Sequence, residues 1–418
     1  MDKKALQKLL LTVLKKNTFS ELLFANFADS DWSELTKLAK KQHVLNIVYL
    51  RLKENNLQKI VPDEILLEMQ KSFEKLTMNN LRLKGEFNKL VNEMQKQDIP
   101  VIALKGMFLT YKIYPYIGLR FMRDLDILVP VNKAHEAYSV AQSLGYQSEN
   151  INEEHFSFFK EHHLLQMINR SGSILEIHGN IISPGKNYSV SPDIFWQNSK
   201  KVKMDNTEFD VLDPIDLILH LCIHISYQDI FYTDLRHYYD LLITLNHYSD
   251  KIDWNEFNKR CYERKWQKGV FFVFKLLNEM FEFKIPAIVE NSFKETITYI
   301  PGLLQNAIEI MWEYDRSKEN FDKHNLYSNH LEAYKNYIEG SFSHKIKVFL
   351  KRIFLSKSDL IYQYSLPEKS FKVYFYYFLR FFDLLFEHKS RLFKLSTDKS
   401  FGDFIAKKVT FYEWLNKS

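Results

Sequence analysis

The chain has 418 residues, of which 46% are hydrophobic and 26% are charged. These proportions are typical of a soluble globular protein with room for two or three domains. Glycine (11) and proline (10) are scarce while phenylalanine (34) and tyrosine (24) are plentiful, so we expect a helix-rich chain. Cys222 and Cys261 are too few for a disulfide framework or a cysteine-rich zinc site, and both fit helical patterns as buried small hydrophobes.

The net charge of +5 is unevenly distributed. Residues 341–418 carry 15 Lys/Arg against 7 Asp/Glu, a surplus of 8, which leaves about −3 for residues 1–340. A basic, aromatic-rich segment suits an anionic partner such as RNA. A solvated helical face on which lysine serves solubility explains the same surplus.

Two features of the sequence bear on compartment. The N-terminal residues Met1–Leu6 do not lead into a signal-peptide cleavage region. The most apolar stretch, Phe371–Phe386, spans 16 residues and contains three charged ones, whereas a membrane-spanning helix needs about 20 apolar residues. We therefore expect a cytoplasmic protein without a transmembrane segment.

The first 97 residues read as helices. Leucine and valine recur at helical spacing from Leu6 onwards. Ser30 or Asp31 is a candidate cap for a helix that continues through Leu52. After Pro62 a long apolar pattern runs to about Gln97. We expect a helical N-terminal region over residues 1–97.

The pattern changes after residue 97. Ile99–Leu104 is a short apolar run typical of a buried strand, and it ends at Lys105-Gly106. The further elements predicted in chain order are a helix over 107–114, a strand over 125–129, a helix over 131–144, and two strands over 163–168 and 174–178. This order predicts a small α+β domain with a mixed sheet, which we place at residues 98–212.

The remaining chain, residues 213–418, again reads as helical. Asp213 is a suitable N-cap with Pro214 at the first helical position. Asp253-Trp254 opens a further helix that runs to about Trp266. The predicted fold class is therefore α+β, with a central α+β domain between helical N- and C-terminal regions.

The segment Arg123–Val129, which contains the predicted strand over 125–129, carries two carboxylates that indicate chemistry. Side chains on a strand alternate between faces, so Asp124 and Asp126 project to the same side. Carboxylates held this close repel each other and favour a divalent cation, and Mg²⁺ usually takes one or two protein carboxylates together with water and substrate phosphates. The pair points towards phosphoryl or nucleotidyl transfer, with Asp124 and Asp126 as metal ligands.

Other candidates flank this pair. Glu176 lies in an alternating strand and is a third carboxylate for the site, although a cross-strand ion pair is an alternative. Lys105 and Gly106 stand at a strand-to-helix junction, which suits phosphate binding. Arg120 and Arg123 are candidates for contact with a triphosphate or for pairing with the carboxylates.

These motifs together resemble a known family. Residues 99–106 and 120–129, Ile-Pro-Val-Ile-Ala-Leu-Lys-Gly and Arg-Phe-Met-Arg-Asp-Leu-Asp-Ile-Leu-Val, resemble the uncharacterised nucleotidyltransferase family of the polymerase-β-like superfamily. More distantly, that family resembles nucleotidyltransferase toxins of bacterial abortive-infection and toxin–antitoxin systems. The resemblance continues through four segments, His162–Leu164, Leu175–His178, His220–His224 and Leu235–Leu241, and includes the Tyr376–Arg380 region.

The resemblance implies a polymerase-β-like fold and an enzyme that moves a nucleoside monophosphate from an NTP such as ATP to an acceptor hydroxyl or phosphate. It implies Mg²⁺ as cofactor, one or two ions, with Mn²⁺ as a substitute. Catalysis would fall to Asp124, Asp126 and Glu176. His163 and His178 are candidates for contact with the acceptor or for support of the carboxylates, and a core role for His178 is an alternative.

The chain departs from the family pattern at two points. Lys105-Gly106-Met107 stands where the superfamily has Gly-Ser or Gly-Gly, so Lys105 would have to compensate for a missing hydroxyl. Glu176 stands where Asp is more usual and reaches one methylene further, which suits an outer-sphere ligand. These departures leave open a second function, a weakly active or inactive module that binds nucleotide or protein.

The enzyme hypothesis has two versions that differ in the acceptor. A small molecule or a peptide natural product suits a closed pocket, whereas a tRNA or other RNA end would use the basic segment 341–418. The surplus of charge is mild, which slightly favours an acceptor other than nucleic acid. A third interpretation, a structural helical protein with a coincidental motif, is disfavoured by the ordered match of the motifs.

Overall fold

The computed structural model describes residues 1–15, 18–148, 164, 166–182, 187–294, 301–315, 374–379 and 399–417. The chain divides into two compact units. The first comprises Met1–Glu149, Phe159–Ser226 and Phe231–Tyr314, and the second comprises Asn150–Phe158, Tyr227–Ile230 and Asp315–Ser418. The sheet and the helices α1 to α13 belong to the first unit, and α19 (Lys399–Asn416) belongs to the second.

The N-terminal residues are helical, as the apolar spacing predicts. The helices are α1 (Lys3–Lys15), α2 (Asp29–Lys41), α3 (Leu45–Glu54) and α4 (Asp63–Gln95). The prediction of one helix through Leu52 is wrong, because the chain breaks between α2 and α3, where His43 adopts a left-handed φ of 54°. Asp31 lies inside α2 and accepts a hydrogen bond from the Ala28 N–H.

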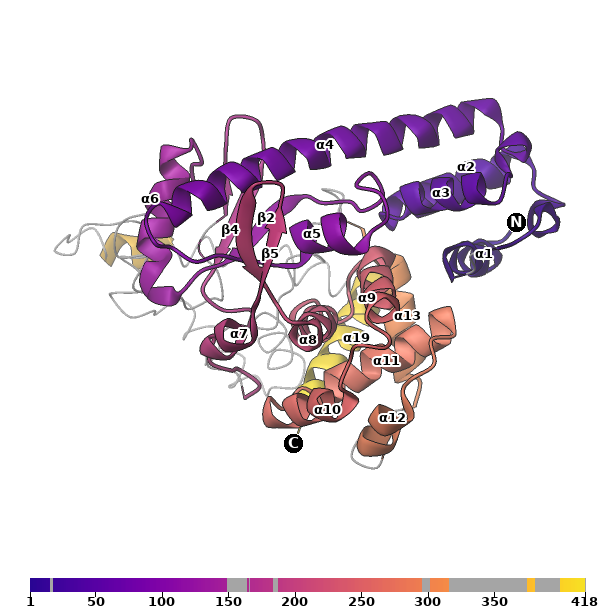
Figure 1. Ribbon diagram of the computed structural model, residues 1–418. Coiled ribbons are helices and arrows are strands. Elements are labelled where there is room, and N and C mark those ends of the chain that lie inside the picture. The colour runs from indigo at the N-terminus through magenta and orange to yellow at the C-terminus, as the bar shows by residue number, and fades with distance from the viewer. Residues whose placement is uncertain are drawn as a thin grey trace. The chain divides into compact units, whose positions relative to one another are not determined.

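A six-stranded mixed sheet forms the centre of the first unit (Figure 1). Its strands are β1 (Ile102–Ala103), β2 (Asp124–Leu128), β3 (Met167–Ile168), β4 (Ile174–His178), β5 (Lys200–Met204) and β6 (Thr207–Val211), in the order β3-β4-β2-β1-β6-β5. The pairs β2·β4 and β1·β6 are parallel, and the other three pairs are antiparallel. The mixed sheet and its flanking helices confirm the predicted α+β class.

The hairpin of β5 and β6 is absent from the sequence-based prediction. Its two strands pair in full register from Lys200 opposite Val211 to Met204 opposite Thr207. The segment alternates polar and apolar residues, with Val202 and Met204 on one face, and Asp205 adopts a left-handed φ of 54° in the turn. Alternation about an Asp-Asn turn is the signal that could have identified it.

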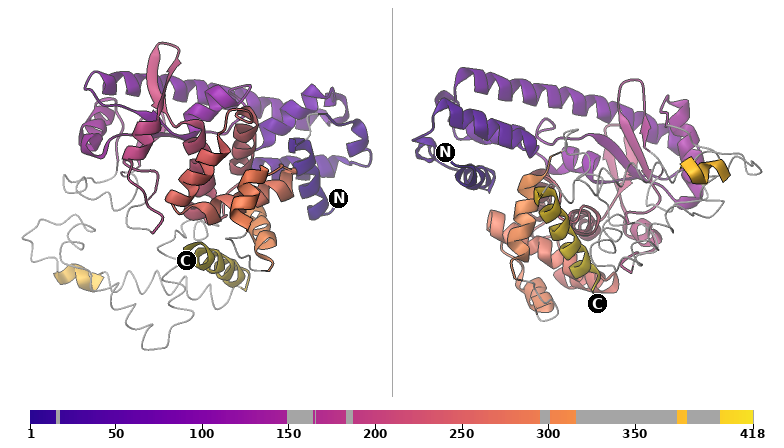
Figure 2. Two further views of the ribbon diagram at one scale, coloured as in Figure 1. Left: turned by 60° about the horizontal axis from the view of Figure 1, so that its bottom comes forward. Right: turned by 180° about the vertical axis from the view of Figure 1, so that it is seen from behind.

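Helices cover the sheet. The long helix α4 packs against β6, where the rings of Phe87 and Phe209 meet edge to face with centroids 4.9 Å apart. The helix α6 (Ala134–Ser143) packs against β4 and α4. Figure 2 shows α4 extending beyond the sheet along α2 and α3. The 33-residue helix α4 and the shorter α6 that packs against it therefore cover the sheet together.

Helices also follow the sheet in the chain. They are α7 (Asp193–Asn198), α8 (Pro214–Ile223), α9 (Leu235–His247), α10 (Trp254–Glu263), α11 (Gln267–Phe281), α12 (Ala287–Lys294) and α13 (Leu303–Glu313). The Asp213 carboxylate accepts a hydrogen bond from the Asp216 N–H, and Asp253 caps α10 in the same way, as predicted. Cys222 and Cys261 are free thiols and are buried, which confirms their predicted role in the core.

Within the described ranges, no helix is long and apolar enough to cross a membrane.

The core beneath the sheet generates a testable prediction. Ile127 is 0% exposed on β2, so truncation to Ala leaves a cavity that its packed neighbours cannot fill. Ile127→Ala should lower the free energy of unfolding by about 2–5 kcal/mol, measured by urea denaturation. Ile168→Ala is the control, because Ile168 is 49% exposed and its loss should change stability by less than about 0.5 kcal/mol.

Candidate functional site

Three carboxylates meet on one face of the sheet. Asp124 and Asp126 project from the same face of β2, while Leu125 and Ile127 between and after them are buried. The parallel register of β2 and β4 places Glu176 directly beside Asp126. The third predicted carboxylate therefore lies next to the Asp pair, on the neighbouring strand.

His178 lies between two of these carboxylates. Its Nε2 is 3.4 Å from Asp126 Oδ1 and 3.6 Å from Glu176 Oε2. Burial disfavours the imidazolium, but hydrogen bonds to Asp126 and Glu176, together with their charges, outweigh burial and raise the His178 pKa to about 9. His178 is therefore protonated at neutral pH and supplies a positive charge inside the carboxylate group.

The two aspartates have different affinities for a proton. Burial and the negative charges of Asp126 and Glu176 raise the Asp124 pKa to about 6. Burial also opposes ionisation of Asp126, but the charge of Lys105 and the hydrogen bond with His178 outweigh it, so the Asp126 pKa lies well below its usual value. Asp126 is the member of the pair that stays ionised over the widest range of pH.

Lys105 and Gly106 form the first turn of α5 (Lys105–Phe108), immediately after β1. The Leu104 N–H donates a 3.0 Å hydrogen bond to the Asp126 carbonyl, which brings this turn next to β2. The charge of Lys105 acts on both aspartates. A Cβ on Gly106 would lie 3.3 Å from the Met122 sulfur, so glycine permits the close approach of this turn to its neighbours.

The two predicted arginines have different surroundings. Arg123 is exposed beside Asp124, and its charge opposes the rise in the Asp124 pKa. Arg120 is only 3% exposed, and its guanidinium binds the Asp240 carboxylate rather than open solvent. The structure therefore leaves Arg123 accessible to a phosphate and gives Arg120 a protein partner.

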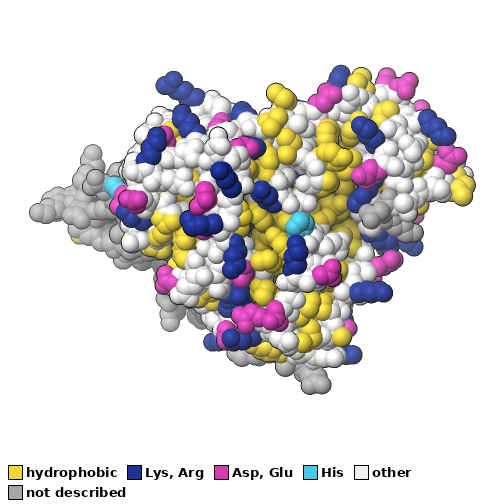
Figure 3. Space-filling model, in the orientation of Figure 1, with side chains coloured by type: hydrophobic (Ala, Val, Ile, Leu, Met, Phe, Trp, Pro, Cys, Tyr) yellow, Lys and Arg dark blue, Asp and Glu magenta, His cyan; other side chains and the backbone are white. Residues whose placement is uncertain are grey.

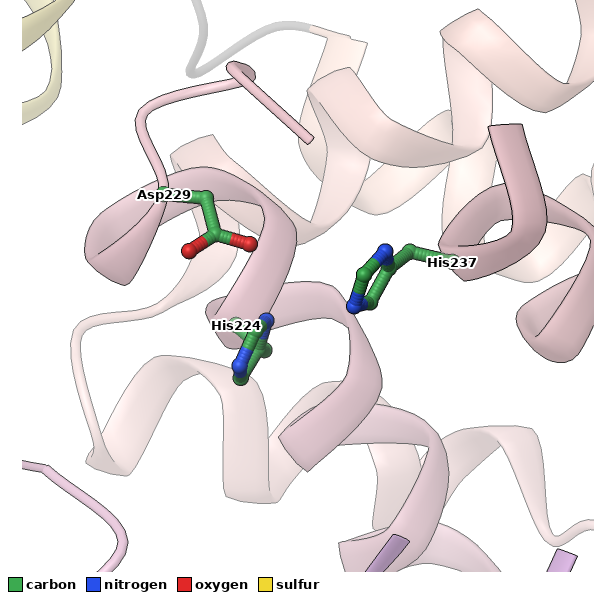
Figure 4. A group of neighbouring side chains, drawn as sticks. All are labelled: His224, Asp229 and His237. Atoms are coloured by element: carbon green, nitrogen blue, oxygen red, sulfur yellow. The ribbon is translucent and has the colours of Figure 1, made fainter. Parts of the chain in front are cut away.

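Histidines of α8, of the π-helical turn His224–Gln228 that follows it and of α9 were not among the predicted site residues. The charge of His224 acts on Asp126, and burial together with the charges of Lys105 and His224 holds the His220 pKa well below its usual value. The rings of His224 and His237 stack with centroids 5.3 Å apart (Figure 4). The four-residue spacing of His220 and His224 on one helix face is the signal that could have identified them.

The comparison with known proteins agrees with this geometry. A model of the uncharacterised nucleotidyltransferase family matches residues 28–282, which include the whole sheet, the three carboxylates and α8 to α10. The chain belongs to the uncharacterised nucleotidyltransferase family. No curated protein matches it. The predicted family and the predicted class of enzyme, a nucleotidyltransferase, are confirmed.

This nucleotidyltransferase has a group of side chains able to hold a metal ion. Oxygen and nitrogen atoms of Asp126, Glu176 and His178 lie within 4.8 Å of one another. The predicted metal pair was Asp124 and Asp126, and this group shares only Asp126 with it. His178 can join the ligands only when its imidazolium loses a proton. The charges of Asp126 and Glu176 act on the neighbouring Asp124. His163 lies outside the residues that the structure describes.

The raised pKa of His178 makes the stability of the nucleotidyltransferase depend on pH. The folded-state pKa of His178, about 9, exceeds the ordinary value of 6.5. The stability that His178 contributes is therefore complete below pH 6.5 and is lost as pH rises through 9. The loss should be on the order of 3 kcal/mol. Urea denaturation in EDTA between pH 6 and 10 measures it.

Two variants control this prediction. His178→Asn should remove the contribution of His178 to the change of unfolding free energy with pH. His247→Asn, at an exposed position of α9, should leave that contribution unchanged. An NMR titration that gives His178 a pKa near 6.5 would contradict the prediction.

Proposed function

We propose that this protein is a Mg²⁺-dependent nucleotidyltransferase that moves a nucleoside monophosphate from an NTP to an acceptor hydroxyl or phosphate and releases pyrophosphate. The observation that carries the proposal is the parallel register of β2 and β4, which sets Glu176 beside Asp126 on the face that also bears Asp124. Three carboxylates on one half-buried face, with Lys105 next to them, match the requirements of this reaction.

The donor atoms suit the proposed ion. Mg²⁺ takes oxygen ligands and is usually held by one or two protein carboxylates, with water and substrate phosphates completing its shell. Asp124 and Asp126 would hold it, and Glu176 would act directly or through water. Bound Mg²⁺ supplies neutralisation of the triphosphate charge and orients the phosphates. Mn²⁺, which has a similar preference for oxygen, is expected to substitute.

The protein residues divide the remaining work. Lys105 binds phosphate oxygens, Gly106 allows the backbone of the same turn to approach them, and exposed Arg123 contacts the triphosphate. The acceptor oxygen attacks the α-phosphorus while the bond from that phosphorus to the bridging oxygen breaks, and pyrophosphate leaves. Glu176 accepts the proton of the acceptor hydroxyl, and the His178 imidazolium holds Glu176 and Asp126 in place.

We further propose that the acceptor is a small molecule or a peptide rather than RNA. Residues 1–340, which include the site, sum to about −3 in charge. On the face shown in Figure 3, Lys and Arg side chains are interspersed with Asp and Glu and form no continuous basic surface. RNA binding relies on such a surface.

Removal of the aspartates tests the reaction. Asp124→Asn combined with Asp126→Asn should lower pyrophosphate release from ATP by at least about 10³-fold, the loss that corresponds to several kcal/mol of charge stabilisation. Labelled NTPs with Mg²⁺ and candidate acceptors provide the assay. The matched control is Glu208→Gln, an exposed carboxylate of β6, which should keep full activity.

Two results of this assay would contradict the proposal. One is a double Asn variant that retains the full rate of transfer. The other is wild-type protein that binds ATP in Mg²⁺ without releasing pyrophosphate in the presence of any acceptor tested. The second result would support the alternative function, a nucleotide-binding module without catalysis.

A salt titration tests the class of acceptor. If the acceptor is not nucleic acid, its KM should change by less than about 3-fold between 50 and 200 mM NaCl. RNA that makes several phosphate contacts loses affinity steeply over the same range, by about 10³-fold for six contacts. A steep fall in activity on RNA ends, with little activity on small acceptors, would contradict this part of the proposal.

A further inference from the structure

A buried ion pair lies behind the Lys105-Gly106 turn, for which we propose phosphate binding. The Arg120 Nε donates to Asp240 Oδ1 at 3.0 Å, and its Nη2 donates to Asp240 Oδ2 at 2.9 Å. The two side chains are 4% and 0% exposed. The pair joins the segment that precedes β2 to α9, across 120 positions of the sequence. Two parallel hydrogen bonds between planar groups fix their mutual direction as well as their distance.

The arginine of this pair also reaches the predicted nucleotide-binding turn. Its third nitrogen, Nη1, lies 3.5 Å from the Gly106 carbonyl, and it would be 3.5 Å from a Cβ placed on Gly106. The Thr110 hydroxyl donates to the same carbonyl at 2.7 Å. The turn that carries Lys105 is therefore backed by Arg120 on the side away from solvent.

The aspartate of the pair is held from two further sides. The Tyr114 hydroxyl, just after the π-helical turn Leu109–Ile113, donates to Asp240 Oδ1 at 2.7 Å. Arg236 Nη1 lies 3.7 Å from Asp240 Oδ2. Arg236 itself pairs with Asp234, which also binds the rings of His43 and His237. Asp240 thus meets two guanidinium groups and one hydroxyl, so its charge is fully compensated.

Stability alone does not account for such a pair. Buried ion pairs contribute little beyond well-packed apolar residues of the same volume, because desolvation of both charges offsets their attraction. What the pair adds is direction, since a bidentate contact tolerates little rotation. Because Arg120 contacts the Gly106 carbonyl, the pair controls the direction of the turn that carries Lys105.

We infer that Arg120 and Asp240 are positioning residues of the nucleotidyl-transfer site, through which α9 sets the direction of the Lys105-Gly106 turn towards the triphosphate. The inference rests on the proposed function. It gives Arg120 an indirect role in nucleotide binding in place of the direct contact predicted from sequence. Neither residue touches substrate in this assignment, and both act through Lys105.

Replacement of the whole pair tests the inference. The double variant R120M/D240L removes both charges of the pair while keeping apolar volume. It also takes Asp240 away from the Tyr114 hydroxyl and Arg236, so its binding is measured well below its own melting temperature. Its KM for ATP, and the Kd for ATP with Mg²⁺, should rise at least about 10-fold. The control is K275M/E290L, which removes the ion pair between α11 and α12 and should leave both constants unchanged.

A double-mutant cycle with Lys105→Met shows whether the effect passes through the lysine. Lys105→Met alone should weaken ATP binding, and adding R120M/D240L to it should weaken binding by less than about 2-fold more. Arg120→Lys is the second variant if R120M/D240L does not fold. Lysine keeps the positive charge but cannot make the two parallel hydrogen bonds of a guanidinium group. It too should raise the KM for ATP.

The outcomes separate this inference from the proposed function. Wild-type protein that neither binds ATP nor releases pyrophosphate contradicts both. Wild-type protein that binds ATP, with R120M/D240L or Arg120→Lys binding it equally well, contradicts the positioning role alone and leaves the pair as packing. If R120M/D240L weakens ATP binding in the Lys105→Met background by the same factor as in the wild type, the effect does not pass through Lys105, which also contradicts the inference.

Discussion

The mutual repulsion of the carboxylates on β2 and β4 is the constraint around which the site is built. Parallel pairing holds Asp126 and Glu176 side by side, and Asp124 lies two residues away on the same face. Half-buried negative charges this close are unstable without compensation. The protein supplies it from two directions, with Lys105 at the end of β1 and the His178 imidazolium at the end of β4.

Further charges are balanced in the same manner away from the sheet. Asp240 lies between Arg120 and Arg236, and Asp234 lies among Arg236 and two histidines. Each of these buried carboxylates has a cationic or hydrogen-bonding partner, and Arg236 contacts both Asp234 and Asp240, so these side chains form a connected set rather than isolated pairs. The Lys105-Gly106 turn lies at one end of that set, and α9 carries the other.

The sequence predicts the local features of this site well and the distant ones poorly. Alternation along a strand was sufficient to put Asp124 and Asp126 on one face, and the strand end at Lys105 followed from the change in apolar spacing. No local rule predicts that Asp126 is opposite Glu176, because strand register depends on the packing of both faces. The Asp240 partner of Arg120 was equally out of reach, since 120 residues separate them.

The shortness of β1 has a mechanical consequence. It contributes two residues to the centre of the sheet, so the strands β3, β4 and β2 are joined to β6 and β5 through two residue pairs on each side. This seam has as few paired residues as the β3·β4 edge, and Lys105 follows Ala103, the last paired residue of β1, by two positions. A small shear along the seam would move the ammonium group relative to the carboxylates while leaving both hairpins intact.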